Sequence, residues 1–202
     1  GNAGESSNFL CYRALRLNYY AVTGLLARVC LYAGQRENAF NYSTEVIKAS
    51  NNGIFPFVDR SLVNGTAQDP DRIFSPEVLF ALSDSQRGEL FEEYFDPSLA
   101  PNMVFRMETD LLEQTIYGGT GTGGNLDDYR CRSNWISSGS ARYFYKYSDM
   151  TESGRIENTM IPLLRLGEMY LIAAESQSNS LANGVSYINT LRKNRGVSNL
   201  QT

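Results

Sequence analysis

The sequence predicts a mostly α-helical protein in which two helical hairpins flank a long, loop-rich insertion containing short strands. Apolar residues recur at three- and four-residue steps in residues 15–50 and again in residues 161–196, which is the spacing of a buried helix face. Between them, residues 51–160 contain clusters of Gly, Asn, Asp, Ser and Pro that interrupt long helices. We therefore expect one domain over residues 1–202.

The first predicted hairpin, residues 15–50, turns at Gly34 and Gln35. Leu26, Ala27, Gly34 and Ala39 fall where a tetratricopeptide unit places its leucine, small residue, turn and small residue, so the hairpin is a degenerate unit of this kind. Small residues allow close helix packing. The expected contact residues are Ala21, Gly24, Leu25, Leu26, Ala27, Val29 and Leu31 in the first helix, and Ala39, Phe40, Tyr42, Val46 and Ile47 in the second.

The insertion, residues 51–160, is predicted to contain four short elements. We expect strands at Val78–Leu82 and Arg142–Tyr147, because both segments are rich in strand-forming residues. Short helices are expected at Arg87–Tyr94 and Asp110–Tyr117. Long irregular segments on a rigid scaffold frequently carry binding sites, so we expect function in this half of the chain.

The second predicted hairpin, residues 161–196, is expected to begin its first helix at Pro162, where a missing N–H is tolerated. Ser176 to Asn183 are helix-breaking residues that separate the two helices, and Gly196 provides a stop. The apolar stripes are Leu163, Leu166, Tyr170 and Ala174 in the first helix, and Val185, Ile188 and Leu191 in the second.

Glu168 and Glu175 are the carboxylate pair best placed for glycoside hydrolysis. Seven residues on a helix place them about 10.5 Å apart along the axis. Inverting glycosidases need about 6.5–9.5 Å and retaining ones about 5–5.5 Å. We instead expect both glutamates to pair with Arg165, Arg192 and Arg195 and to stabilise the hairpin. No catalytic residues are predicted.

Composition excludes several other functions. The formal net charge is −4 with mixed signs, which argues against a nucleic-acid partner. The sequence contains no histidine, which removes Ser-His-Asp and Cys-His catalysis and histidine metal sites. No metal site or cofactor is expected. Cys30 is expected to be a buried thiol, although a disulfide between Cys11 and Cys30 is left open.

The glycine-rich composition of residues 116–136 is typical of a flexible loop, and sugar recognition is the alternative function that we consider for it. Sugars present apolar C–H faces and hydroxyls, so their sites combine an exposed aromatic platform with polar side chains. Trp135, the only tryptophan, offers the largest flat face and one donor; its alternative is burial between loop and scaffold. The glycines at 119, 121 and 124 match a nucleotide-binding spacing but lack the flanking strand and helix. The predicted glycan-binding residues are Trp135, Tyr117, Tyr129, Asn125, Asp128 and Arg130.

Both hairpins resemble those of the SusD/RagB family, and the match follows the same order along the chain. Pro76–Phe80 resembles the family's "E-V-I-F" strand. Gly184 departs from the pattern, since it stands where the family prefers alanine. The remaining matches are Leu25–Tyr32, Gly34, Ala39 and Glu45–Ile47, then Pro162, Arg165, Glu168, Leu171, Ala174, Glu175, Ile188, Asn189, Leu191, Arg192, Arg195 and Gly196.

The resemblance implies a SusD-like outer-membrane nutrient-binding lipoprotein of Bacteroidetes, active in polysaccharide utilisation. Such a protein sits on the cell surface and captures an oligosaccharide for a TonB-dependent, SusC-like transporter. We expect the chain to be a soluble fragment that lacks the amino-terminal lipoprotein segment and the carboxy-terminal part, so that the membrane is reached only through the missing lipid anchor. The alternatives are a protein-interaction scaffold without sugar binding and, third, a glycoside-active enzyme.

Overall fold

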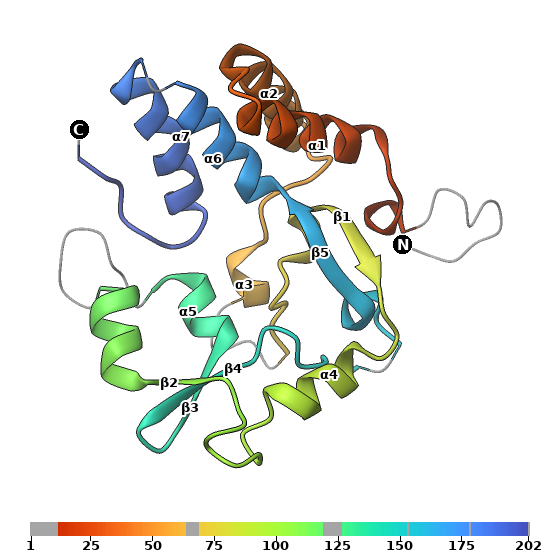
Figure 1. Cartoon of the computed structure of the whole chain (residues 1–202), viewed down its shortest axis with the longest axis vertical. Coiled ribbons are helices and arrows are strands. Elements are labelled where there is room, and N and C mark those ends of the chain that lie inside the picture. The colour runs from red at the N-terminus through yellow and green to blue at the C-terminus, as the bar shows by residue number, and fades with distance from the viewer. Residues whose placement is uncertain (1–11, 64–68, 119–126, 153, 178, 202) are drawn as a thin grey trace.

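The computed structural model describes residues 12–63, 69–118, 127–152, 154–177 and 179–201. Figure 1 shows the helical hairpins on one side and the insertion, with its own small sheet, on the other. The α-helices are α1 Tyr19–Tyr32, α2 Arg36–Asn51, α3 Arg60–Val63, α4 Arg87–Tyr94, α5 Tyr129–Asn134, α6 Leu166–Ser176 and α7 Leu181–Lys193. The strands are β1 Val78–Ser83, β2 Arg106–Glu108, β3 Trp135–Ser138, β4 Ala141–Phe144 and β5 Met160–Arg165.

Shorter helical turns complete the described chain. They are the 3-10 turns Arg13–Leu15, Ser75–Glu77 and Ile156–Thr159, and the π-helical segment Leu111–Ile116. No helix in the described ranges has the length and apolar character needed to cross a membrane.

The two hairpins share one hydrophobic core. Helices α1 and α2 form the first hairpin and α6 and α7 the second, and α2 packs against both α1 and α6. Ala27, Val46, Leu166, Met169 and Ala173 are buried together in this core. The prediction of a mostly α-helical fold built on two hairpins is therefore confirmed, and so is the turn between α1 and α2.

The first hairpin packs through the small residues of α1, as predicted, but its large residues face outwards. A Cβ atom at Gly24 would lie 3.3 Å from Leu79 Cδ1 and from Met169 Sδ, so a larger residue would require these side chains to shift by a few tenths of an ångström. Leu25, Leu26 and Val29 lie on the opposite face and are 41%, 40% and 53% exposed. Their predicted place in the helix contact is wrong, because the neighbouring elements all approach the small-residue face.

Strands β1 and β5 form a two-stranded antiparallel sheet beside the hairpins. The predicted helix start at Pro162 is wrong, since Pro162 lies within β5 opposite Ala81 and helix α6 begins at Leu166. Proline is tolerated there because β5 has a single neighbouring strand, which leaves one edge without ladder hydrogen bonds. The strand predicted at Val78–Leu82 is present and is one residue longer.

The insertion folds around a three-stranded antiparallel sheet of order β2-β4-β3. Helix α4 has the predicted bounds, and the helix predicted at Asp110–Tyr117 is the π-helical segment. The strand predicted at Arg142–Tyr147 is β4, which ends at Phe144. Cys30 and Cys131 are buried free thiols, whereas Cys11 lies outside the described residues.

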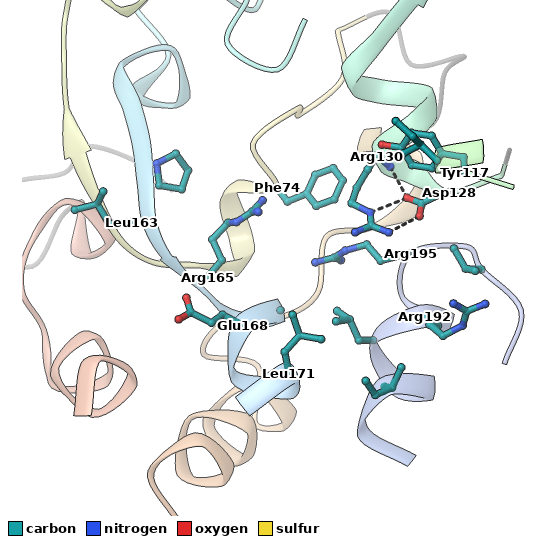
Figure 2. Close-up of a pocket in the computed structure, with 16 residues that line it drawn as sticks. Phe74, Tyr117, Asp128, Arg130, Leu163, Arg165, Glu168, Leu171, Arg192 and Arg195 are labelled. Atoms are coloured by element: carbon teal, nitrogen blue, oxygen red, sulfur yellow. Dashed lines mark hydrogen bonds and ion pairs between the residues drawn. The ribbon is translucent and has the colours of Figure 1, made fainter. Parts of the chain in front are cut away.

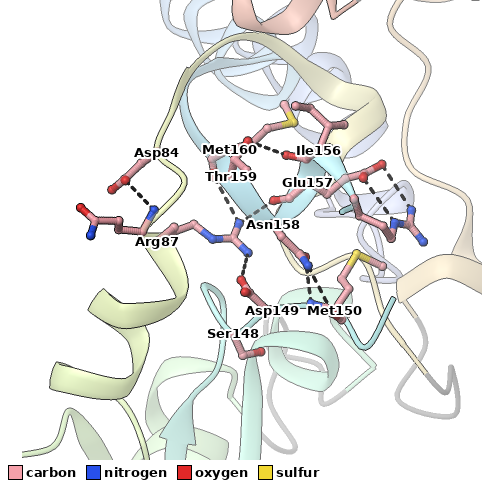
Figure 3. A network of polar contacts seen from close by, with 12 residues as sticks. Asp84, Arg87, Ser148, Asp149, Met150, Ile156, Glu157, Asn158, Thr159 and Met160 are labelled. Atoms are coloured by element: carbon pink, nitrogen blue, oxygen red, sulfur yellow. Dashed lines mark hydrogen bonds and ion pairs between the residues drawn. The ribbon is translucent and has the colours of Figure 1, made fainter. Parts of the chain in front are cut away.

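Buried Arg87 fixes α4 to the segment that leads into β5 (Figure 3). Its Nη1 donates to the carbonyl oxygens of Glu157 and Met160 at 2.6 and 3.2 Å, and its Nη2 donates to Asp149 Oδ1 at 3.1 Å. One side chain thus satisfies two backbone carbonyls and one carboxylate. This arrangement holds the insertion against the β1–β5 sheet.

Candidate ligand-binding cleft

A cleft of about 640 Å³ lies between the second hairpin and the insertion. Its volume falls within the range of about 300–1,000 Å³ that is usual for small-molecule sites. We call it the arginine cleft, because four arginines line it (Figure 2). The lining residues are Phe74, Ile116, Tyr117, Asp128, Arg130, Pro162, Leu163, Arg165, Gly167, Glu168, Leu171, Ile188, Leu191, Arg192, Arg195 and Val197.

Three of the predicted glycan-binding residues, Tyr117, Asp128 and Arg130, lie together in the wall of the arginine cleft that the insertion contributes. Asp128 precedes α5 and caps it by accepting from the Arg130 backbone N–H at 2.8 Å. The same carboxylate accepts from Arg130 Nε at 3.0 Å and Nη2 at 2.6 Å. This hydrogen bonding raises the pKa of Arg130, and burial raises the pKa of Tyr117.

One other predicted residue, Tyr129, does not lie in the cleft wall. Tyr129 is absent from the lining and packs instead against Val58, Val63 and Phe74. Its backbone N–H donates to the Arg195 carbonyl at 3.0 Å, so it joins α5 to the end of the second hairpin. Asn125 lies outside the described residues, as do the glycines at 119, 121 and 124.

Trp135 does not form an exposed platform, so this part of the prediction is wrong. It is 9% exposed and opens β3 within an aromatic cluster. Its ring lies 5.2 Å from that of Phe144 and 5.9 Å from that of Phe105, which together cover it. Trp135 also lies close enough to Tyr117 to counteract part of the rise in the Tyr117 pKa that burial causes. Trp135 therefore supports the aromatic residue of the cleft rather than lining it.

The hairpin side of the cleft combines charged residues with exposed aliphatic side chains. Leu163 on β5 and Leu171 on α6 are 43% and 49% exposed, although Leu163 was predicted to lie in an apolar stripe. Ile188 and Leu191 on α7 extend this surface. The result is an apolar floor of aliphatic side chains facing the polar wall of Tyr117, Asp128 and Arg130.

The predicted ion pairs within the second hairpin are absent among the interactions of the described residues. Glu168 accepts from Arg28 Nε and Nη2 on α1, at 2.6 and 2.7 Å, and thereby joins the two hairpins. Arg195 pairs with Glu77 at the start of β1. The observed partners differ from the predicted ones because residue spacing within one hairpin does not indicate charged residues that another element supplies.

Arg165 differs from the other charged residues of the cleft. It ends β5, is half-buried, and has no side-chain hydrogen bond or ion pair within the described part of the chain. Burial lowers its pKa, and the positive charges of Arg195 and Arg130 lower it further, against the attraction of Glu77. Sequence patterns singled out Arg165 and Arg195 only as hairpin ion-pair residues, and no local signal indicated that they share a cleft.

No protein-family model matches the sequence, and no curated protein matches it significantly. Solved structures do match. A SusD-like carbohydrate binding protein from Bacteroides vulgatus aligns with 98% of this chain and 41% of its own, at a TM-score of 0.58 and 19% identity. A SusD superfamily protein from Bacteroides thetaiotaomicron aligns with 89% of this chain and 41% of its own, at a TM-score of 0.59 and 21% identity.

A laminarin binding SusD-like protein aligns with 90% of this chain and 48% of its own, at a TM-score of 0.53 and 15% identity. The chain thus spans less than half the length of each of these structures. The likeness nevertheless extends over both hairpins and the insertion, and it agrees with the motif resemblance in the sequence. The chain has the fold of SusD-like proteins.

Proposed function

We propose that the protein is a SusD-like oligosaccharide-binding protein and that the sugar occupies the arginine cleft. The observation that carries this proposal is the combination, in one cleft, of an apolar floor with a wall of hydrogen-bonding side chains. The fold likeness to SusD-like proteins, one of which is named as laminarin binding, supports the same function.

Each wall of the cleft has a distinct role in this proposal. The C–H face of a sugar ring packs against Leu171 and Leu191 or against the ring of Tyr117, because these surfaces are apolar. The Arg130 guanidinium, held in place by Asp128, donates to sugar hydroxyls along the opposite edge. A side chain already held in its bound geometry loses less entropy on binding.

The cleft is suited to binding rather than to bond cleavage. Its two carboxylates, Asp128 and Glu168, each accept two guanidinium hydrogen bonds. Glycoside hydrolysis requires one carboxyl group that holds a proton and another that is available to the sugar or to water. Both carboxylates of the cleft are instead occupied by guanidinium donors, so neither is available to a sugar or to water. We therefore propose a non-enzymatic function.

We further propose that the whole protein acts at the cell surface of the outer membrane as a lipid-anchored partner of a TonB-dependent, SusC-like transporter. The fold likeness and the sequence motifs support this placement. The net charge of −4 gives no support to a nucleic-acid partner. Co-purification of the transporter with the protein from outer membranes tests the partnership, and transporter-free protein would contradict it.

Sugar binding is tested by calorimetry on an oligosaccharide panel with Tyr117→Ala and, as a matched control, Tyr94→Ala. Tyr94 is exposed at the end of α4 and does not line the cleft. We expect Tyr117→Ala to weaken binding by about tenfold or more, as loss of a central aromatic contact does. Equal affinities of both variants for every bound sugar would contradict the proposed site.

A second candidate function, a protein-interaction scaffold, is favoured by the outer face of α1. Val22, Leu25, Leu26, Val29 and Tyr32 form a continuous exposed apolar stripe there. The burial of Trp135 also removes one argument for sugar. A Leu26→Glu substitution distinguishes the two functions, since it should abolish binding of a protein partner while leaving sugar affinity unchanged.

A further inference from the structure

We propose that the arginine cleft selects acidic oligosaccharides and that Arg165 pairs with a carboxylate or sulfate group on the sugar. This inference rests on the proposed function and adds the chemical class of the ligand. It is carried by an excess of positive charge in the cleft, by the position of Arg165, and by the shape of the surface around it.

The charges of the cleft do not balance. Asp128 is paired with Arg130, and Glu168 is paired with Arg28, which lies outside the cleft lining. Arg195 is neutralised from behind by Glu77. Each carboxylate that borders the cleft is thus already paired, and no carboxylate of the described residues forms an ion pair with Arg165. The cleft therefore presents positive charge to an incoming ligand.

Arg165 is placed to use this charge. Its guanidinium extends from the end of β5 towards Phe74, at the centre of the cleft (Figure 2). It is half-buried, and a charge removed from water without a partner is costly unless something pairs with it. The nearby charges of Arg195 and Arg130 repel it, as the lowered pKa of Arg165 records. An anionic ligand would relieve both costs.

A second half-buried cation lies within the field of Arg165. Burial and the charge of Arg165 lower the pKa of Lys146 to about 8. Like Arg165, Lys146 has no ion pair in the described ranges of the chain, and its ammonium lies 5.0 Å from the Tyr147 ring centroid. Lys146 lies outside the lining of the arginine cleft, so it contributes charge near Arg165 but no contact to a ligand in the cleft.

The shape of the cleft selects an acidic sugar over a small inorganic anion. A guanidinium matches the two oxygens of a carboxylate or sulfate through parallel N–H donors. A small inorganic anion would interact with the guanidinium alone. The apolar floor of Leu163 and Leu171 remains exposed unless the ligand also brings C–H surface. A sugar ring carrying an acidic substituent satisfies both features.

The test compares oligogalacturonate, its fully methyl-esterified form, a sulfated galactan oligosaccharide and poly-glutamate by calorimetry at fixed ionic strength. We expect at least one acidic sugar to bind about tenfold more tightly than the neutral ester, a difference typical of one charge-assisted contact. Arg165→Gln should abolish this preference. Arg106→Gln, on exposed β2 and outside the cleft lining, should preserve it.

Arg165→Lys provides a second variant that keeps the charge but lacks the paired donors, and an intermediate preference is expected from it. The comparison of acid with ester in the unaltered protein does not depend on any variant folding. If neutral sugars bind as tightly as acidic ones, the selectivity is overturned while the proposed function stands. Tight Arg165-dependent binding of poly-glutamate alone would assign the cleft to acidic peptides. If no sugar binds, both proposals fail.

Discussion

Arg195 and Glu77, which are 118 residues apart in sequence, form a buried bidentate ion pair between the end of α7 and the start of β1. Glu77 Oε1 also accepts from the Val58 backbone N–H at 3.1 Å. The Arg195 guanidinium lies over the rings of Phe74 and Phe57, at 4.9 and 5.6 Å from their centroids. This pair joins the second hairpin to the start of β1, and its arginine lines the arginine cleft.

The first prediction concerns the stability of this pair. Glu77→Gln leaves the Arg195 charge buried without its counter-ion, so we expect a loss of about 3–5 kcal/mol in unfolding free energy. Glu168→Gln breaks the half-exposed pair with Arg28 and should cost about 0–1 kcal/mol. Urea unfolding measures both. Equal losses in the two variants would show that burial does not determine how much each ion pair contributes to the unfolding free energy.

The second prediction compares two glycines with similar backbone angles. Gly196 and Gly34 have φ of +75° and +73°, a region that costs other residues about 1–2 kcal/mol. A Cβ at Gly196 would also lie 2.6 Å from Tyr129 Cε1 and 2.7 Å from the Asp127 carbonyl oxygen, whereas the space around Gly34 is open. Gly196→Ala should therefore lower the melting temperature more than Gly34→Ala, and the reverse order would contradict the packing of α5 on the hairpin.

The third prediction concerns Trp135. Its burial in the aromatic cluster predicts that Trp135→Ala costs about 3–5 kcal/mol of stability. Ile136→Ala, the adjacent residue on β3 and 37% exposed, serves as the control and should cost much less. Trp135→Phe should retain most of the sugar affinity, because the indole does not line the cleft. A large loss of sugar affinity in a well-folded Trp135→Phe protein would indicate that Trp135 contacts the sugar.

The fourth prediction uses the pKa of Lys146, which is about 8 in the folded protein against an ordinary value of 10.5. The unfolded chain therefore holds more protons than the folded one between about pH 8 and pH 10.5. The free energy of unfolding therefore increases as pH rises through that window. Below pH 8, Lys146 is charged in both states, and the cost of burying its charge destabilises the folded protein in full.

Lys146→Met removes this contribution, so its stability advantage over the unaltered protein should be largest at pH 7 and should shrink by pH 10. Urea unfolding at several pH values follows the difference. Lys48→Met, an exposed lysine on α2, is the matched substitution. A pH-independent difference for Lys146→Met would contradict the burial of a charged lysine beside Arg165.

The sequence predicted the hairpins because helical periodicity and the turn at Gly34 are local signals. It did not predict which face of α1 is buried, because small residues such as Gly24 and large ones such as Leu26 make both faces apolar. Pro162 was misassigned for a related reason. Its neighbours suit a strand or a helix equally, and only the partner strand β1 decides between them.

Three of the residues predicted to bind sugar line the arginine cleft, and their contact with sugar stays a prediction. Tyr117, Asp128 and Arg130 are close in sequence, so the composition of one segment was enough to indicate them. Arg165 belongs to another element and reaches the same cleft only through packing. The burial of Trp135 could not be predicted locally, because Phe105 and Phe144, which cover it, come from other segments of the chain. Long-range packing, absent from local patterns, decided each of these outcomes.

The most direct test of the account is a crystal structure of the protein soaked with the tightest-binding oligosaccharide of the panel. The account predicts sugar density in the arginine cleft, with a ring against Leu171 or Tyr117 and polar contacts to Arg130 and Arg165. Sugar bound at full occupancy on another surface, while the arginine cleft stays empty, would contradict it.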